Sequence, residues 1–259
     1  MENKKIGFIG AGNMAFAISK SINDEINIFD NSKSQYDKFH KNAFKCENLN
    51  QLVENSDIIF LSVKPQNFSD LLVDIKQLEY KHKVFVTIAA GITTNFIAEF
   101  LGDIKIIRVM PNTPLLIGEG ATALCRNDLV NDDEFNFICN VFQKSGEVAI
   151  IDENKMNEII AINGSSPAYI YYIADIVAKY GASVGIDENI ALKLFAQTLI
   201  GSGKMILQST DSPKVLTEKV CSKGGTTIEA INSFKKDNLE QIFKNAMDKC
   251  IKRAYELSK

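Results

Sequence analysis

The sequence is poor in the residues that build metal sites and disulfide frameworks. Its 259 residues include only two histidines, His40 and His82, and both lie in the N-terminal half. The five cysteines are scattered and odd in number, and no pair has the spacing of metal ligands. We therefore expect no metal centre and a cytoplasmic protein whose thiols stay reduced.

The chain also lacks a strong charge imbalance and a long apolar run. Its net charge of −3 favours no nucleic-acid partner, because an acidic surface repels phosphates. No apolar run approaches the length of a membrane span, and the first five residues leave no room for a signal peptide. With 46% hydrophobic and 24% charged residues, the composition is that of an ordinary globular protein without a membrane partner.

A glycine-rich segment near the N-terminus is the strongest positive signal. The apolar run Ile6–Ile9 predicts a buried parallel strand, and Gly10 and Gly12 follow it directly. These glycines allow a tight turn and a close approach of the backbone to a ligand. A helix is predicted from Met14, with Ala15 as the third small residue. This Gly-x-Gly-x-x-Ala pattern is the dinucleotide-binding fingerprint, in which a helix N-terminus binds the pyrophosphate.

The segment after the second predicted strand bears on the choice of cofactor. Strand 26–30 ends in Asp30, which could accept a hydrogen bond from a ribose 2′-hydroxyl and favour NAD. Ser32, Lys33 and Ser34 could instead hold a 2′-phosphate and favour NADP. The two signals conflict, and the sequence leaves the choice between NADH and NADPH open.

Predicted strands and helices alternate as far as residue 151. Further strands are expected at 58–63, 84–88, 105–110, 118–124 and 146–151, and a polar helix at 33–45 carries His40 on one face. From residue 152 only helical periodicity is found, at 154–162, 168–180, 188–209, 212–220, 228–235 and 239–257, with Gly181 ending the second helix. We expect a Rossmann-type doubly wound α/β sheet in residues 1–151 and an all-α dimerisation and substrate domain in residues 152–259. Helices that are apolar on more than one face predict a homodimer through this second domain.

A second glycine loop precedes one of the predicted C-terminal helices. Gly224 and Gly225 place bare N–H groups at a helix N-terminus, which is an anion site suited to a carboxylate. The hydroxyls of Thr226 and Thr227 can donate or accept beside it. On these residues alone, a glycine loop with a threonine cap is an equally good interpretation.

Together these segments resemble the pyrroline-5-carboxylate reductase family over nearly the whole chain. The motifs that carry the resemblance are Gly7–Ala15, Ser62–Gln66, Ala89–Gly91, Arg108–Pro114, Gly164–Tyr169 and Val220–Ala230. The last two, in this order, look specific to the family. Two positions depart from the usual pattern, since Lys223 replaces a proline and Asn163 a serine. Lys223 loosens the loop and adds a positive charge near the expected carboxylate site.

The resemblance implies reduction of the cyclic imine 1-pyrroline-5-carboxylate to L-proline, the last step of proline biosynthesis. It implies NADPH as cofactor, with NADH possible, and a homodimer or a larger homo-oligomer. Thr227 is then the catalytic candidate, because its hydroxyl can bond the ring nitrogen as that atom becomes an amine. The candidate substrate-binding residues are Ser165, Ser166, Gly224, Gly225, Thr226 and Thr227. The candidate cofactor-binding residues are Gly10, Gly12, Asn13, Met14, Asn31, Ser32, Lys33, Val63, Lys64, Pro65, Ala89, Ala90, Gly91, Asn112 and Pro114.

Two other functions are weighed against this one. A β-hydroxyacid-type dehydrogenase would need a lysine on the helix after the domain boundary, but Lys155 lies too early and 164–169 holds none. A dinucleotide-sensing regulator would keep the first glycine motif and lose the second, which is intact.

Several candidate residues also have purely structural interpretations. Asn112 could only hold its proline-rich turn, Lys64 could be a solvated charge, and Asp30 could be a turn residue. Ser165 and Ser166 could only cap a helix.

Overall fold

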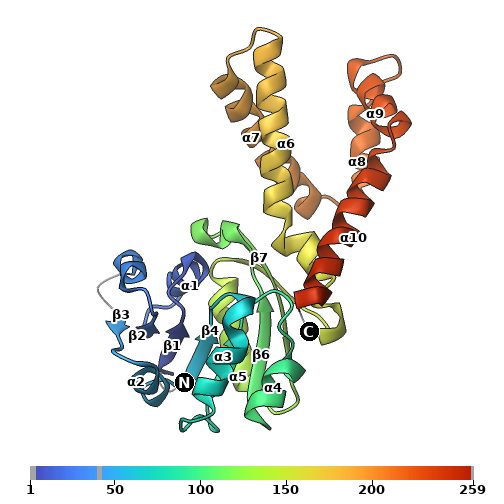
Figure 1. Ribbon diagram of the computed structural model, residues 1–259. Helices are drawn as coiled ribbons and strands as arrows, with labels where there is room; N and C mark the ends of the chain where they lie inside the picture. Colours follow the sequence, from blue (N-terminus) through green and yellow to red (C-terminus); the bar gives the residue numbers. More distant parts are fainter. Residues whose placement is uncertain (1–3, 40–42, 258–259) are drawn as a thin grey trace. The chain divides into compact units, whose positions relative to one another are not determined.

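The computed structural model describes residues 4–39 and 43–257 and divides into two units. Unit 1 contains the chain up to Pro167 together with the residues from Lys249 onward, and unit 2 is Ala168–Asp248. Figure 1 labels the elements of both units. Residues 1–3 and His40, on which sequence predictions fall, lie outside the described residues.

Unit 1 is built on a single mixed sheet. The described residues form eight strands in the order β3-β2-β1-β4-β5-β6-β7-β8, so the chain starts in the middle and winds outward in both directions. The strands are β1 Ile6–Ile9, β2 Ile26–Phe29, β3 Ala43–Lys45, β4 Ile58–Leu61, β5 Val84–Thr87, β6 Lys105–Met110, β7 Gly120–Arg126 and β8 Gly146–Ile150. The predicted Rossmann-type fold class is confirmed.

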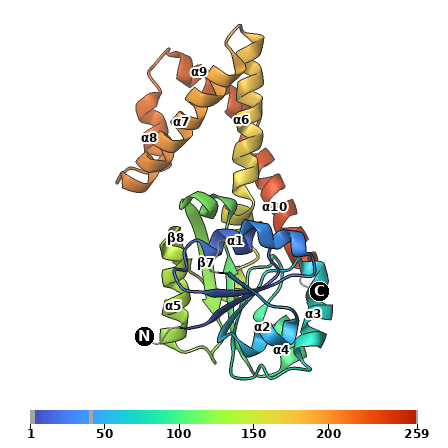
Figure 2. The same ribbon diagram turned by 90° about the vertical axis from the view of Figure 1, so that its left-hand side faces the viewer.

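Helices cover both faces of this sheet (Figure 2). On one face lie α1 (Asn13–Ser19) and α5 (Asp132–Gln143), and on the other α2 (Leu49–Glu54), α3 (Phe68–Ile75) and α4 (Thr94–Leu101). The first core includes Phe8 and Phe60, whose rings stack at 4.7 Å, and Phe142 of α5. The central strands are fully buried because helices cover both sides, which explains their continuous apolar runs.

The sheet is not parallel throughout, whereas the alternation of predicted strands and helices leads one to expect a parallel sheet. Strands β6 and β7 pair antiparallel, with Val109 opposite Leu124. Residues 111–119 connect them, and they contain the short 3₁₀ turn η3 (Thr113–Ile117) and Gly118, at φ 79°. A connection this short cannot carry the crossover that a parallel pair requires, so β7 runs back along β6.

The polar helix predicted over 33–45 is also wrong. The segment instead forms a 3₁₀ helix, η1 (Lys33–Lys38), and then strand β3, which pairs with β2. The Tyr36 hydroxyl donates to the carbonyl of Asp30 at 3.0 Å and accepts from its N–H at 2.9 Å. These bonds hold η1 against the end of β2. The residues that follow η1 can therefore pair with β2 as the edge strand β3.

The helix predicted over 154–162 forms only in fragments. The structure has a 3₁₀ turn, η4 (Glu153–Lys155), and a π-helical turn, η5 (Ile160–Gly164). The carboxylate of Glu153 is bonded to Thr94 and Arg108, which fixes the start of this segment against α4 and β6.

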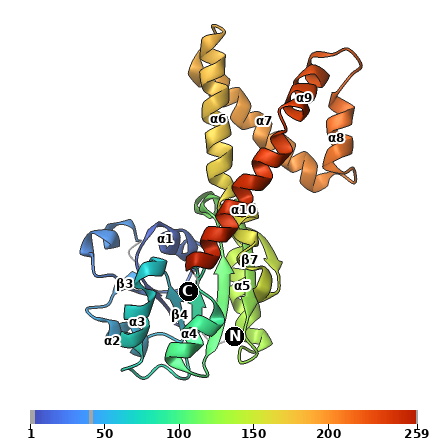
Figure 3. The ribbon, with the colours of Figure 1, turned by 45° about the vertical axis from the view of Figure 1, so that its right-hand side comes forward.

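Unit 2 is helical throughout its described residues (Figure 3). Its helices are α6 (Ser166–Ser183), which begins at the end of unit 1, α7 (Glu188–Gln208), α8 (Pro213–Val220), α9 (Thr226–Lys236) and α10 (Leu239–Leu257), which continues into unit 1. Gly181 does not end α6 as expected, and the turn comes at Gly185, with φ 86°. A Cβ at Gly181 would lie 2.6 Å from that of Ala191, so this glycine permits a close approach of α6 and α7.

Unit 2 leaves much apolar surface uncovered. No residue of α7, α8 or α9 is buried, and the exposed fractions are 64% for Leu194, 75% for Leu207 and 68% for Val220. Helix α7 is long and apolar enough, by length and composition alone, to cross a membrane. This corrects the expectation that no apolar run approaches that length. Because no residue of α7, α8 or α9 is buried, unit 2 alone has little hydrophobic core.

Candidate functional site

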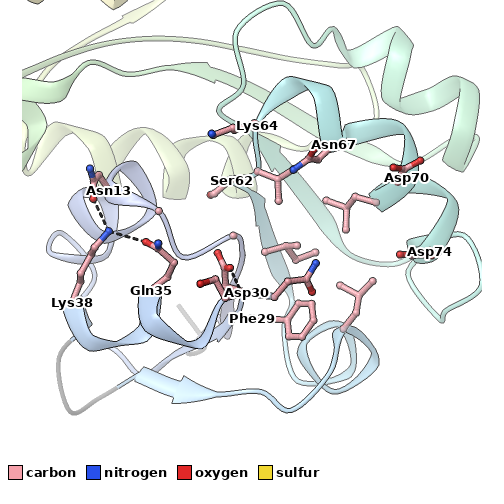
Figure 4. Close-up of a pocket in the computed structure, with 18 residues that line it drawn as sticks. Asn13, Phe29, Asp30, Gln35, Lys38, Ser62, Lys64, Asn67, Asp70 and Asp74 are labelled. Carbon is pink, nitrogen blue, oxygen red and sulfur yellow. Dashed lines mark hydrogen bonds between the residues drawn. The ribbon is translucent and has the colours of Figure 1, made fainter.

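A pocket of about 760 Å³ lies beside the carboxyl ends of β1, β2 and β4 (Figure 4). This is where ligands bind in open α/β sheets. The lining residues come from the glycine turn, the end of β2, η1, the start of α2, the end of β4 with the turn that follows it, and the face of α3. They are Ile9, Gly10, Gly12, Asn13, Phe29, Asp30, Asn31, Ser32, Gln35, Lys38, Leu49, Ser62, Val63, Lys64, Asn67, Asp70, Leu71 and Asp74.

The two glycines of the turn have different roles. Gly10 has φ 95°, and a Cβ there would lie 2.7 Å from the carbonyl oxygen of Ser62. Its N–H donates to the carbonyl of Phe29 at 2.8 Å, so Gly10 packs the turn between strands. Gly12 is the N-cap of α1, and a Cβ there would meet nothing within 4 Å. Gly12 therefore leaves open space at the wall of the pocket, where a ligand can approach the backbone.

Asp30 ties the two loops of the pocket together. Its Oδ2 accepts from the N–H of Ala11 at 2.8 Å, and its Oδ1 accepts from the N–H of Ser32 at 2.7 Å. Each carboxylate oxygen thus already accepts a backbone hydrogen bond. The turn-residue interpretation of Asp30 therefore has direct structural support, whereas a ribose contact would have to share these oxygens.

Lys38 is a pocket residue that the sequence analysis missed. Its Nζ donates to Asn13 Oδ1 at 2.7 Å and to Gln35 Oε1 at 2.8 Å, and Figure 4 shows it reaching from η1 towards the glycine turn. The helix predicted over 33–45 gave no reason to single it out. The tighter 3₁₀ helix brings Lys38 to the pocket, while Lys33 is not among the lining residues.

The pocket has the chemistry of a dinucleotide site. Ser62 Oγ is buried in the wall and has no hydrogen-bond partner among the described residues. Gly12 opens the backbone on one side, and Asn13 and Lys38 supply donors next to it. Ile9, Phe29, Leu49 and Leu71 form an apolar part of the lining that suits an adenine ring. The residues present therefore fit the adenosine half of a dinucleotide.

Other predicted cofactor residues do not line this pocket. They are Met14, Lys33, Pro65, Ala89, Ala90, Gly91, Asn112 and Pro114. Gly91 follows β5 at φ 82°, and a Cβ there would lie 2.8 Å from the carbonyl oxygen of Ala254 and 2.9 Å from Cβ of Leu257. The last turns of α10 thus approach this loop too closely for a larger residue.

Asn112 is held in a network with Asn163. Asn112 Oδ1 accepts from the N–H of Ala121 at 3.0 Å, and its Nδ2 donates to the carbonyl of Asn163 at 3.3 Å. Asn163 Nδ2 donates to the carbonyls of Met110 and Ala121 at 2.8 and 3.0 Å. Asn163, one of the two departures from the family pattern, therefore cross-links β6 and β7, and Asn112 braces its own turn.

The two serines at the start of α6 bond to their own surroundings. Ser166 Oγ donates to the carbonyl of Ile162 at 2.5 Å. Ser165 Oγ and Cys250 Sγ form a hydrogen bond at 3.2 Å. In this structure both hydroxyls serve the junction of η5, α6 and α10.

The second glycine motif lies in unit 2, at the start of α9. Gly224 has φ 72°, and the N–H of Gly225 donates to the carbonyl of Ser222 at 3.0 Å. Gly225 is the N-cap of α9 and offers no side-chain cap, so N–H groups of the first turn are left for a ligand or water. Thr226 is exposed and Thr227 half-buried. The start of α9 therefore presents unpaired N–H donors with two threonine hydroxyls beside them.

A buried polar cluster lies behind the strand ends and was not predicted. The Arg108 side chain, 1% exposed, donates from Nη1 to Glu153 at 3.3 Å and from Nη2 to Asn157 at 2.6 Å. Glu153 also accepts from the N–H and hydroxyl of Thr94 at 2.9 and 2.6 Å. Burial, followed by the charge of Glu153, raises the pKa of the Cys125 thiol to about 12. The cluster joins α4, β6 and β7 to the segment that leads to unit 2.

Two family models match separate parts of the chain. Residues 153–257 match the family model "Pyrroline-5-carboxylate reductase dimerisation", and residues 5–91 match "NADP oxidoreductase coenzyme F420-dependent". The pyrroline-5-carboxylate reductase of Escherichia coli K12 is 36% identical, with 99% of each chain covered. The chain belongs to the pyrroline-5-carboxylate reductase family. The enzyme of Arabidopsis thaliana is 31% identical over 99% of this chain and 96% of its own.

Solved structures of the family have the same fold. Pyrroline carboxylate reductase of Plasmodium falciparum, described with NADP bound, superposes with a TM-score of 0.91 at 28% identity and full coverage of both chains. The 1-pyrroline-5-carboxylate reductase of Streptococcus pyogenes gives a TM-score of 0.90 at 32% identity, with 98% of each chain covered.

Proposed function

We propose that this protein reduces 1-pyrroline-5-carboxylate to L-proline with NADPH. The observation that carries the proposal is the presence, in one chain, of a dinucleotide pocket and an intact Gly224–Thr227 anion loop, in a family of that name. A dinucleotide-sensing protein would need only the first of these sites. The NADP bound to the Plasmodium falciparum relative supports NADPH as the cofactor here.

The chemistry asks little of the protein beyond positioning. When bound, the nicotinamide supplies a hydride to the imine carbon, and the ring nitrogen takes a proton, which yields the secondary amine of proline. A cyclic imine is readily protonated near neutral pH, so its carbon is already electrophilic and no strong acid is needed. The two histidines both lie in the N-terminal half, so the helical half does not supply one.

The loop before α9 would bind the substrate carboxylate. We assign this role to the N–H groups around Gly224, Gly225 and Thr226, because the first turn of a helix presents unpaired donors and a positive dipole. The hydroxyl of Thr227 would hydrogen-bond the ring nitrogen as it becomes an amine. Lys223 is exposed next to this loop and adds positive charge for the carboxylate.

The assay for these roles is steady-state NADPH oxidation with 1-pyrroline-5-carboxylate. Thr227→Val keeps the shape but removes the hydroxyl, and we expect kcat to fall about 100-fold, as on removal of other positioned donors. Thr227→Ser keeps the hydroxyl and should retain most of the rate. Equal rates for both variants would show that the hydroxyl of Thr227 has no role in the reaction, although the proposed reaction itself would stand.

We also propose that two copies pair through their C-terminal helices. The support is the dimerisation family match and the apolar side chains of α7 and α8, which a single chain leaves exposed. Helix α7 is then an interface helix, and its lysines, Lys193 and Lys204, argue against burial in lipid. Light scattering should give at least twice the mass of one chain, and Leu207→Asp should shift it towards the monomer. A monomeric wild-type protein would contradict the pairing.

We keep residues 1–151 as the proposed cofactor-binding domain and 152–259 as the proposed dimerisation and substrate domain. A cytoplasmic location is proposed with them. All five cysteines are free in the structure, which suits a reducing compartment.

A further inference from the structure

We propose that Lys38 binds the 2′-phosphate of the cofactor and gives this protein its preference for NADPH over NADH. The inference rests on the proposed use of NADPH and assigns its recognition to a residue outside the glycine fingerprint. It also replaces Lys33, one of the candidates that the sequence offered for a 2′-phosphate, by a lysine five residues further along the same 3₁₀ helix.

The position of Lys38 in the pocket is the first argument. Its ammonium group is held between Asn13 Oδ1 at 2.7 Å and Gln35 Oε1 at 2.8 Å, so it lies between the glycine turn and η1. Ser32, the N-cap of η1, also lines the pocket, and its hydroxyl and that of Ser34 form a hydrogen bond at 3.0 Å. A phosphate bound against η1 can therefore accept hydrogen bonds from the Lys38 ammonium group and from the Ser32 hydroxyl, both of which line the pocket.

The charge around Lys38 is the second argument. Both of its hydrogen-bond acceptors are neutral amides, and within residues 4–39 and 43–257 no carboxylate lies at ion-pair distance from it. The ammonium charge is thus uncompensated by the protein and available to an anion. Of the pocket carboxylates, Asp70 and Asp74 lie on α3, across the pocket from Lys38 in Figure 4.

Asp30 is the third pocket carboxylate, and its two bonds give it a structural role besides the ribose contact that is typical of NAD-specific sites. In NAD-specific sites an acid at the end of the second strand accepts from the ribose hydroxyls. Here Asp30 already accepts from the N–H groups of Ala11 and Ser32. Its carboxylate therefore acts as a brace between the two loops of the pocket.

Two nucleotides that differ only in the 2′-phosphate isolate this contact. Calorimetric titration of the purified full-length protein compares adenosine 2′,5′-bisphosphate with AMP. We expect the unchanged protein to bind the bisphosphate more tightly. Lys38→Met should weaken bisphosphate binding by about 10- to 100-fold, the range for a hydrogen bond to a charged group, and change AMP binding by less than about twofold. Lys38→Arg keeps the charge and should keep most of the preference.

Two further lysine variants complete the experiment. Lys81→Met removes a charge from an exposed lysine outside the pocket and should change neither titration. Lys33→Met tests the alternative lysine, and loss of the preference there, with its retention in Lys38→Met, would overturn the proposal. Thermal melting of each variant without nucleotide checks that it is folded.

The remaining outcomes are also decisive. Equal weakening of bisphosphate and AMP by Lys38→Met would place the lysine on the 5′-phosphate and contradict the proposal. Equal affinity of the wild-type protein for adenosine 2′,5′-bisphosphate and AMP would also contradict the proposal. Because no imine is present in these titrations, failure of the proposed reaction would be seen separately, as absence of NADPH oxidation with 1-pyrroline-5-carboxylate.

Discussion

Removing the charge of Glu153 should leave the buried Arg108 without its ion-pair partner and destabilise the fold. In Glu153→Gln the side-chain carbonyl can still accept from the N–H of Thr94, so the start of α4 keeps its bond. The guanidinium of Arg108, 1% exposed, loses its ion-pair partner at 3.3 Å. The variant therefore isolates the charge from the shape of the cluster.

The structure sets the size of this effect. Breaking a fully buried ion pair by removing one partner costs about 3–5 kcal/mol. The Glu153 side chain is 30% exposed, and Asn157 still accepts from Arg108, so we expect roughly 2–3 kcal/mol. For a chain of this size, that lowers the melting temperature by about 4–12 °C.

Circular dichroism melting at one fixed protein concentration measures this, since oligomerisation makes the transition depend on concentration. Asp132→Asn is the matched control, because Asp132 pairs with Arg126 at the surface and is 82% exposed, and it should cost no more than about 1 kcal/mol. The double variant Arg108→Met/Glu153→Gln removes the stranded cation and should recover part of the loss. A single variant as stable as the control, or a double variant with fully additive losses, would refute the reasoning.

Two glycines and one thiol give further tests. Gly91 has φ 82°, and a Cβ there would lie 2.8 Å from the carbonyl oxygen of Ala254, so Gly91→Ala should lower the free energy of unfolding by at least about 1–2 kcal/mol without nucleotide. Gly12→Ala should leave the melting temperature without nucleotide unchanged and weaken NADPH binding in a calorimetric titration. The reverse pattern would contradict the roles given to them. Cys125, with a pKa raised to about 12, stays a thiol from pH 7 to pH 9, and mass spectrometry should find it unlabelled by iodoacetamide throughout. Labelling that rises across this range would show the pKa to be lower.

Much of the first site could be predicted because its signals are local. A strand, two glycines and a helix lie within about a dozen residues, and the conformations of Gly10 and Gly12 follow from that order. The antiparallel return of β7 could not be predicted in the same way. It depends on the five-residue turn η3 and Gly118, whose effect on direction appears only once β6 offers an edge for pairing.

The missed residues act through contacts between distant segments. Lys38 reaches Asn13, 25 positions earlier, only because η1 is a 3₁₀ helix that Tyr36 ties to the end of β2. Arg108 and Glu153 are 45 positions apart, and nothing in the local sequence marks them as partners. At Gly181 the local signal was misleading. A glycine near a helix end predicts that the helix stops there, but here it permits a close contact between α6 and α7.

Conversion of 1-pyrroline-5-carboxylate by the purified protein tests the central claim most directly. With NADPH in excess, chromatographic amino-acid analysis should find L-proline accumulating, with one NADPH oxidised for each proline formed. NADPH that is bound tightly but not oxidised, or oxidised without formation of proline, would contradict the account.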